Sequence, residues 1–306
     1  MNPHSSASAI ANLRPPHSDT LPRRPGYFVV GAGPPIVMLH SSLSSKSQWT
    51  ALAERLASRF RVIALDLCGY GDNTMLAAEG SFTLDDEIGV ITDHLERLVE
   101  PRTRVQVVGH SYGALVALRF AQCHRDRVAS LTLYEPVAFR VLDDQDPELI
   151  RVGHVAERVR RLVEAGCRAD AAQVFVDFWS GDGSYASLPQ TAQVSITSRI
   201  GKVPLDFQAT SQWPLGPAEL HTIVAPTLLL GGSRSPAVVQ RILTVLTDAL
   251  PDSRRPGAFD AGHMGPVTDP DRINPWIEAF ADICAERETI HRAHAKMASI
   301  EVRTLT

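Results

Sequence analysis

Short runs of consecutive apolar residues alternate with longer segments in which apolar residues recur every three or four positions. The short runs predict buried strands at residues 27–30, 36–39, 61–66, 105–108 and 127–135. The longer segments predict helices at residues 47–59, 83–98 and 114–121. Thr83 and Asp86 have the spacing of a capping box at the start of the second helix. Because strands and helices alternate, we predict an α/β fold with a mostly parallel central sheet flanked by helices.

The pattern changes between about residues 138 and 220. Helical periodicity is present from His154 to Glu164 and from Ala171 to Trp179, and turn-rich sequence joins such stretches. No segment in this part has the pattern of a strand. We therefore expect a helical cap, inserted at residues 138–220 between two parts of the sheet domain.

The pattern of the sheet returns after residue 221. It predicts a strand at 226–232, a helix at 236–250, a last strand from Arg254 to Phe259 and a closing helix from Ile273 to Cys284. The predicted core domain comprises residues 26–137 and 221–284. Residues 1–25 are rich in Pro, Ser and Ala and are predicted to be a disordered leader. Residues 285–306 form a polar C-terminal extension that the pattern does not assign to any element.

Composition excludes several classes of function. The 306 residues suit one large domain or a core with an insertion, and the net charge is only −4. No basic stripe suggests nucleic acid, and no apolar run approaches the ~20 residues of a membrane span. The four cysteines are scattered, with no spacing typical of metal or redox sites: Cys68, Cys123, Cys167 and Cys284. With no hydrophobic leader segment either, we predict a cytoplasmic protein with reduced thiols.

The most informative motif is Gly109-His110-Ser111-Tyr112-Gly113. It follows a β-branched run and precedes a long apolar helix pattern, which is the strand–turn–helix setting of a nucleophile elbow. In so tight a turn, side chains two positions before and after the serine would collide, so both positions require glycine. Ser111 is therefore the candidate nucleophile, and the alternative is a serine in an ordinary turn between a strand and a helix.

With this motif in place, the chain resembles the α/β-hydrolase superfamily over roughly residues 27–284. Five short motifs occur in the order and at the distances that this family shows, and together they are more specific than any one alone. The motifs are Leu39-His40-Ser41-Ser42, Asp66-Leu67-Cys68-Gly69-Tyr70-Gly71, Gly109-His110-Ser111-Tyr112-Gly113, Pro226-Thr227-Leu228-Leu229-Leu230-Gly231 and Gly262-His263-Met264.

The resemblance implies a catalytic triad in the chain order Ser, acid, His. It makes Ser111 the nucleophile and His263, after the last predicted strand, the general base. The alternative for His263 is a histidine of a surface loop. His40 and His110 are expected to be structural, because neither can approach Ser111 from the side that leaves room for substrate.

The acid of the triad is where this sequence departs from many relatives. They carry an aspartate just after the strand at 226–230, whereas here Ser235 occupies that position. Glu135 ends the preceding strand, which resembles the arrangement of haloalkane dehalogenases and some lipases. We therefore predict that Glu135 orients His263, with Asp260 as the alternative acid and a capping or salt-bridged glutamate as the structural alternative. Asp66 is expected to bind backbone N–H groups of the turn at 68–71.

The same resemblance implies an oxyanion hole. One donor is the backbone N–H of Tyr112, the residue after the nucleophile. The second is assigned to Ser42, with Ser41 as the next choice, and a serine hydroxyl there could add a further donor. Four aromatic residues of the cap could line an acyl pocket or only pack its helices: Phe175, Phe178, Trp179 and Trp213.

These assignments imply a carboxylic ester hydrolase that acts on a small or medium acyl ester, lactone or related carbonyl compound, without cofactor or metal. A carbon–carbon bond hydrolase, a thioesterase and an acyltransferase use the same triad and remain alternatives. A dehalogenase or epoxide hydrolase is disfavoured, because both need an aspartate nucleophile. The alternative from another class is a ligand receptor on the same fold. The partner is a small-molecule substrate, and the sequence leaves open the identity of that substrate, formation of a homodimer and the role of both termini.

Overall fold

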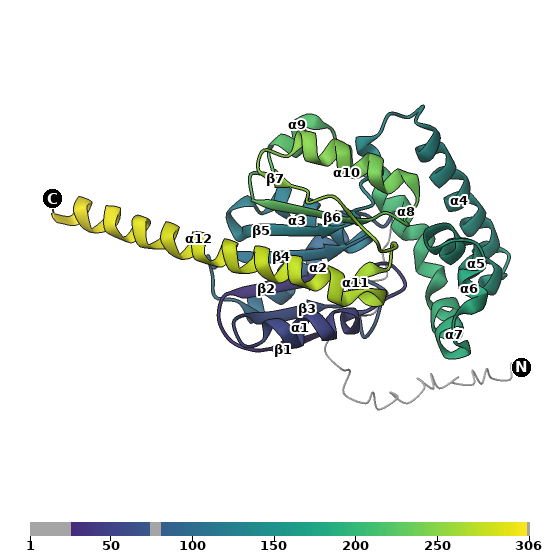
Figure 1. The fold of residues 1–306 in the computed structure, drawn as a ribbon, viewed down its shortest axis with the longest axis horizontal. Helices are drawn as coiled ribbons and strands as arrows, with labels where there is room; N and C mark the ends of the chain where they lie inside the picture. Colours follow the sequence, from purple (N-terminus) through teal and green to yellow (C-terminus); the bar gives the residue numbers. More distant parts are fainter. Residues whose placement is uncertain (1–25, 74–80, 305–306) are drawn as a thin grey trace, which may run out of the picture.

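The computed structural model describes residues 26–73 and 81–304, with side chains described up to residue 290. The predicted leader at 1–25 lies outside the described residues. An eight-stranded sheet forms the centre, in the order β1-β3-β2-β4-β5-β6-β7, and β8 also pairs with β6 (Figure 1). Only β1 is antiparallel to its neighbour, so the prediction of a mostly parallel sheet is confirmed. The strands are β1 Tyr27–Val30, β2 Pro35–Leu39, β3 Arg61–Leu65, β4 Val105–His110, β5 Val128–Tyr134, β6 Thr227–Gly232, β7 Ser253–Arg254 and β8 Ala258–Phe259.

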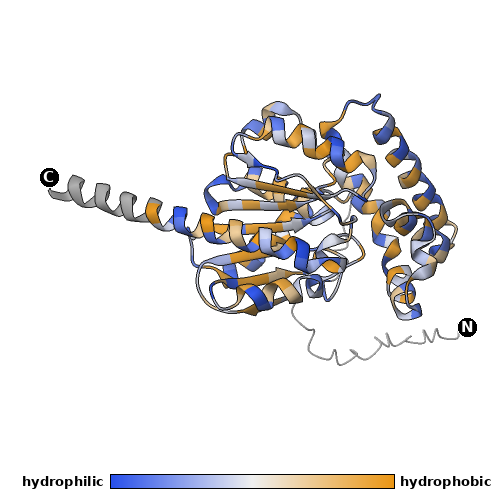
Figure 2. Ribbon diagram, in the orientation of Figure 1, coloured by the Kyte–Doolittle hydropathy of each residue, from blue (hydrophilic) through white to orange (hydrophobic). Residues whose placement is uncertain are grey.

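Helices cover both faces of the sheet, because alternate residues of the buried strands point to opposite sides. On one face, Val37 and Leu39 pack with α2, α3 and α10. On the other face, Ile36 and Met38 pack with α1 and α12. The apolar positions of the ribbon lie along these contacts (Figure 2). The helices are α1 Thr50–Leu56 after the short η1 Lys46–Trp49, α2 Leu84–Leu98, α3 Tyr112–Cys123, α9 Pro217–His221, α10 Ala237–Ala249, α11 Gly265–Thr268 and α12 Pro270–Thr304.

Two predicted elements differ from the structure. The expected strand from Arg254 to Phe259 is two short strands, β7 and β8, which pair with different parts of β6. Pro256 and Gly257, the latter with φ of 114°, interrupt the pairing, since proline has no N–H to donate. The predicted helix at 273–284 begins at Pro270 and continues through the polar extension to Thr304, past the edge of the sheet (Figure 1).

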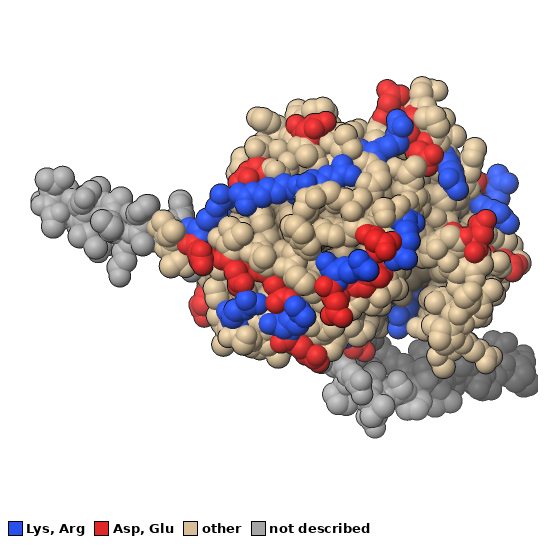
Figure 3. All heavy atoms as spheres, in the orientation of Figure 1, with Lys and Arg blue, Asp and Glu red and all other residues tan. Residues whose placement is uncertain are grey.

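Ion pairs hold α12 to the core. Arg59 contacts Asp282 at 2.6 Å and Arg104 contacts Glu288 at 2.8 Å. Acidic and basic side chains are interspersed on the face that α12 crosses (Figure 3). Among the described residues, no helix is long and apolar enough to cross a membrane.

The segment between β5 and β6 is helical, and its residues, all of them described, include no strand. Its longer helices lie together at one end of the sheet (Figure 1). The predicted stretches at 154–164 and 171–179 fall within α4 and α5, whereas α7 and α8 have little amphipathic pattern and were not predicted. We call residues 138–216 of this segment, which α9 follows, the cap. Its helices are η3 Phe139–Val141, α4 Pro147–Glu164, α5 Arg168–Ser180, α6 Ser184–Ser187, α7 Gln190–Arg199, η4 Ile200–Lys202 and α8 Val203–Gln212.

Candidate active site

Ser111 lies in the turn between β4 and α3, with φ of 54° and ψ of −115°. The two flanking glycines are required by close packing, as the sequence predicts. A Cβ atom on Gly109 would lie 2.6 Å from the Cα atom of Ala114. A Cβ atom on Gly113 would overlap the carbonyl oxygens of Leu39 and His40. The turn therefore presents the Ser111 hydroxyl beyond the carboxyl edge of the sheet, beside the N-terminus of α3.

Ser111, His263 and Glu135 form a continuous chain of hydrogen bonds. The Nε2 atom of His263 lies 2.9 Å from the Ser111 hydroxyl oxygen, and its Nδ1 atom lies 2.7 Å from Oε2 of Glu135. The carboxylate accepts the Nδ1 proton, so Nε2 is the unprotonated nitrogen that accepts from the serine hydroxyl. All three side chains are buried. This geometry is that of a nucleophile, a general base and the acid that orients the base.

Ser235, which occupies the position where many relatives carry an aspartate, binds the carboxylate of Glu135. Its second carboxylate oxygen, Oε1, accepts hydrogen bonds from the Gly232 N–H at 2.6 Å and from the Ser235 hydroxyl at 2.7 Å. Glu135 is fully buried and has a φ of 48°, an uncommon backbone conformation for a glutamate. Asp260, the alternative acid, is largely exposed and pairs with Arg234 at 3.4 Å. The structure thus brings Glu135, and not Asp260, to His263.

The two other histidines near the site have structural contacts. His40 Nε2 accepts from the Leu67 N–H at 3.0 Å, so its Nδ1–H donates to the Ser41 carbonyl at 2.7 Å. Burial lowers the pKa of His40 to about 4, which keeps it neutral. His110 donates from Nε2 to the carbonyl of His263 at 2.8 Å, and burial holds the pKa of His110 well below its usual value. Both residues support the loops of the site and neither contacts Ser111 through a hydrogen bond.

Asp66 also has structural contacts, but with different partners from those expected. Its carboxylate accepts from the backbone N–H of Asp72 at 2.8 Å and of Lys46 at 2.7 Å, and it pairs with the Lys46 ammonium at 2.6 Å. The expected bonds to the turn at 68–71 are not the ones that form. Gly71 passes so close to the Asp66 side chain that the turn continues one residue further before a backbone N–H reaches the carboxylate.

Residues 40–43 form what we call the oxyanion loop. Their hydrogen bonds distinguish Ser41 from Ser42, the two candidates for the second oxyanion donor. The Ser41 N–H donates to Oε1 of Gln48 at 3.1 Å, and the Ser41 hydroxyl donates to the same atom at 3.0 Å. The Ser42 hydroxyl donates to Oδ2 of Asp206 at 2.6 Å. The Ser41 N–H and the Ser42 hydroxyl hydrogen are thus both engaged, so the N–H groups of Ser42 and Tyr112 stay the predicted donors of the oxyanion hole.

A small cavity of about 20 Å³ adjoins the Ser111 side chain. That volume holds roughly one water-sized molecule. Asp206 contributes the only formally charged side chain among the described residues that line it, and no lysine or arginine does. The lining is otherwise mostly apolar and comes from core and cap together: Ser42, Ser111, Tyr112, Val137, Phe139, Phe175, Trp179, Val203, Asp206, Phe207 and Thr210.

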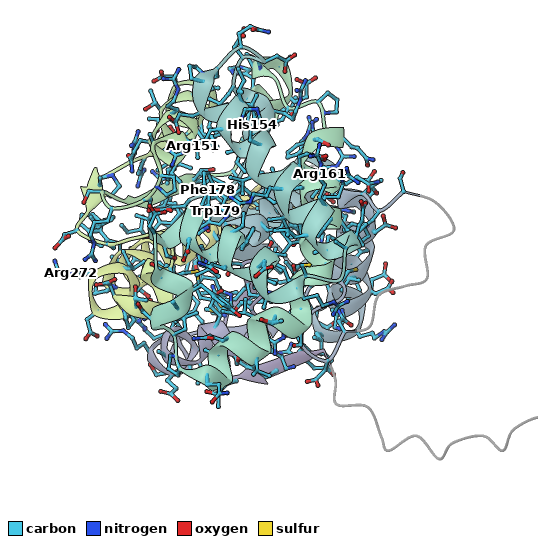
Figure 4. The ribbon with its side chains drawn as sticks, turned by 90° about the vertical axis from the view of Figure 1, so that its right-hand side faces the viewer. Arg151, His154, Arg161, Phe178, Trp179 and Arg272 are labelled. Atoms are coloured by element: carbon cyan, nitrogen blue, oxygen red, sulfur yellow. The ribbon has the colours of Figure 1, made fainter. Side chains whose placement is uncertain are left out.

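Trp179 of α5 stacks on the imidazole of His263, with ring centroids 4.2 Å apart and 23° between the ring planes. Phe178 packs beside it at 5.0 Å, and Arg151 covers Phe178 from the outside (Figure 4). The sequence placed Trp179 in the cap but gave no reason to separate it from the other aromatic residues there. Asp206 was not predicted either, because an acidic residue on an unpredicted helix carries no motif.

Among known proteins, the chain is similar to a protein of Bacillus subtilis assigned as a 2-succinyl-6-hydroxy-2,4-cyclohexadiene-1-carboxylate synthase. The identity is 25% over 274 residues, which cover 83% of this chain and 94% of that protein. A haloalkane dehalogenase of Agrobacterium fabrum is 33% identical over 122 residues, covering 39% of this chain and 38% of the dehalogenase. The solved structure of MenH from S. aureus superposes with a TM-score of 0.70 at 20% identity, covering 85% of this chain and 98% of MenH.

The family-level comparison spans most of the sheet and the whole cap. The model of the alpha/beta hydrolase fold matches residues 34–270. This range contains the turn at Ser111, the end of β5 at Glu135 and the loop of His263. The chain belongs to the alpha/beta hydrolase family.

Proposed function

We propose that this protein is a serine hydrolase that cleaves a neutral carboxylic ester, or a related carbonyl compound such as a lactone, through an acyl-enzyme on Ser111. The observation that carries the proposal is the hydrogen-bonded chain from Glu135 through His263 to Ser111. Ser111 meets the Nε2 atom of the proposed base, and the Nδ1 atom of that base meets Glu135, as the three roles require. Among the described residues, no lysine or arginine pairs with Glu135. Three of the four non-glycine residues with positive φ in the described chain lie at this site: Leu43, Ser111 and Glu135. Such backbone strain concentrates at functional sites.

The proposed reaction proceeds in two halves. The Ser111 oxygen attacks the carbonyl carbon while His263 Nε2 takes the hydroxyl proton, and the resulting oxyanion accepts from the N–H groups of Ser42 and Tyr112. The carbon–oxygen bond to the leaving group then breaks, and His263 returns its proton to the departing alcohol. Water repeats the sequence on the acyl-enzyme, with His263 as base, and releases the acid and free Ser111.

The cavity supports an uncharged substrate. Its lining offers apolar contacts and one carboxylate, Asp206, and no lysine or arginine to pair with an anion. A negatively charged acyl group would find no unpaired cation among the described lining residues, since the Asp206 carboxylate is already paired with Lys202. The Bacillus relative is named for a compound that carries a carboxylate. The charge of this cavity therefore argues against an anionic substrate of that kind for this chain.

The test is hydrolysis of p-nitrophenyl esters from acetate to octanoate by the wild type and by Ser111→Ala. We expect turnover by the wild type and its loss in Ser111→Ala. Ser130→Ala is the matched control. It also removes a buried serine hydroxyl, but one that donates to the side chain of Gln106 on β4 at 3.1 Å and lies outside the triad. A fluorophosphonate should label the wild type and Ser130→Ala but not Ser111→Ala. A well-folded wild type that neither reacts with the fluorophosphonate nor turns over an ester would overturn the proposal and favour a ligand receptor.

A further inference from the structure

Three charged side chains are buried together where the cap meets the core. They are Glu87 of α2, Lys202 of η4 and Asp206 of α8, with exposed fractions of 0%, 6% and 4%. The Lys202 ammonium contacts Oε1 of Glu87 at 3.1 Å and also pairs with Oδ1 of Asp206. Buried ion pairs lose so much hydration that they often add little net stability. Net stabilisation of the fold therefore does not by itself account for this cluster.

The carboxylate oxygen of Asp206 that does not contact Lys202, Oδ2, faces the oxyanion loop. Oδ2 accepts from the Ser42 hydroxyl at 2.6 Å and from the Tyr70 hydroxyl at 2.5 Å. Because Lys202 holds Oδ1 and two hydroxyls hold Oδ2, the carboxylate is fixed in one orientation. Its bond to Ser42 joins residues 164 positions apart in sequence and is a direct link from the cap to the loop.

The oxyanion loop is held from two sides. On the core side, Gln48 binds both the N–H and the hydroxyl of Ser41. On the cap side, Asp206 binds Ser42 and the Arg199 guanidinium donates to the carbonyl of Leu43 at 3.2 Å. Leu43 has a φ of 63°, a conformation that a leucine adopts only when its surroundings impose it. Two consecutive loop residues thus depend on cap side chains for their position.

We propose that Asp206 is a positioning residue that sets the backbone N–H of Ser42 for the oxyanion, with Lys202 fixing its carboxylate. The inference rests on the proposed function, since it concerns the same reaction. It assigns the cap a second task besides lining the cavity. The oxyanion hole is complete only when α8 is seated against the loop, so catalysis depends on the cap even for a substrate too small to touch most of it.

The experiment is a double-mutant cycle with Asp206→Ala, Ser42→Ala and the double variant, assayed on p-nitrophenyl acetate. Removing one oxyanion donor from an acyl-transfer enzyme costs roughly 10²–10³-fold in kcat, so misplacing one should cost about 10–100-fold. We expect each single variant to lose about that much in kcat with KM within about threefold of wild type. The double variant should be no slower than the slower single variant, because both act through one hydrogen bond. Asp206→Asn keeps one acceptor oxygen for the Ser42 hydroxyl but loses the charge that pairs with Lys202, so it should lose less kcat than Asp206→Ala.

The inhibition constant of a trifluoromethyl ketone distinguishes a positioning role of Asp206 from a purely structural one. The ketone adds to the serine and forms an oxyanion, so its inhibition constant should rise in parallel with the loss in kcat/KM. Asp177→Asn is the matched control, because Asp177 is a cap carboxylate that accepts from the Tyr185 N–H at 2.8 Å and does not contact the loop. If Asp206→Ala does not fold, Ser42→Ala alone carries the test, because it removes the same hydrogen bond from the loop side.

The outcomes separate the two proposals. A wild type with no esterase activity and no fluorophosphonate labelling refutes the proposed function itself. An active wild type whose Asp206→Ala and Ser42→Ala variants keep full kcat refutes only the positioning role. Losses that multiply in the double variant also refute it, because they would mean that the two side chains act independently.

Discussion

The indole of Trp179 covers one face of the His263 imidazole, at 4.2 Å between ring centroids. Trp179 belongs to α5 of the cap, and His263 belongs to the loop after β8. During the proposed reaction the imidazole becomes an imidazolium, and the electron-rich face of an indole attracts such a cation. The stack also leaves the ring few orientations other than the one in which Nδ1 meets Glu135 and Nε2 meets Ser111.

Trp179→Leu should therefore lower kcat by about tenfold, since a desolvated cation–π contact is worth roughly 1–2 kcal/mol. Trp179→Phe keeps an aromatic face and should lose less. Steady-state kinetics on p-nitrophenyl acetate measure both. Trp213→Leu is the control, because Trp213 is equally buried but lies against Arg119 rather than His263. Equal losses in the Leu variants at 179 and 213 would contradict a specific role for the stack.

Glu135→Gln should reduce kcat by roughly 10³–10⁴-fold, by analogy with amide replacement of the triad carboxylate in serine proteases. The amide keeps the shape of the side chain but cannot stabilise the imidazolium by charge. Circular dichroism and thermal unfolding should show a folded protein. Asp260→Asn, at the exposed acid three residues before His263, should keep nearly the full rate. The reverse ranking of the two variants would transfer the role of the acid to Asp260.

Phe207→Ala should shift the chain-length preference toward longer esters. Phe139 and Phe207 stack at 6.3 Å and line both the small cavity and an outer groove of about 750 Å³ between α4 and α8. Removing one ring opens the cavity toward this groove. We expect the ratio of kcat/KM for octanoate over acetate to rise by about tenfold or more, given ~0.8 kcal/mol for each methylene that becomes buried. Leu205→Ala, which changes the groove but not the cavity, should leave the ratio unchanged.

Acid should destabilise the fold through His40. Its pKa is lowered from 6.5 to about 4 by burial, so between these values the unfolded chain binds a proton that the folded chain does not. Stability from this residue is intact above about pH 6.5 and falls by about 3 kcal/mol by pH 4. Urea unfolding of wild type and His40→Gln at pH 7 and at pH 4.5 tests this, and the wild type should lose more stability between the two. The exposed His154→Gln serves as control and should show the wild-type pH dependence.

The sheet and the turn at Ser111 were predicted from local signals, since a β-branched run and two glycines that a tight turn requires are readable from neighbours in the chain. His263 and Glu135 were instead assigned from the resemblance to the α/β-hydrolase superfamily. Many relatives carry an aspartate where this chain has Ser235. Because serine cannot supply the carboxylate, Glu135 became the predicted acid.

The contributions of the cap were not readable in the same way. Trp179 meets His263 across 84 residues of sequence and Asp206 meets Ser42 across 164, and neither pair belongs to a local pattern. The helices that carry Asp206 and Arg199 have little apolar periodicity, so the pattern gave no signal for either of them. The extension of α12 beyond Cys284 was not predicted, because its sequence is predominantly polar.

The bond between Ser235 and Glu135 places the ends of two neighbouring strands, β5 and β6, at a single point beside His263. An acid on either strand end can thus serve the same imidazole. A carboxylate at position 235 would replace a hydroxyl that now donates to Glu135, so the two positions are alternatives for one acid rather than places for two. In this fold the acid can therefore change strand without any movement of the imidazole or the serine.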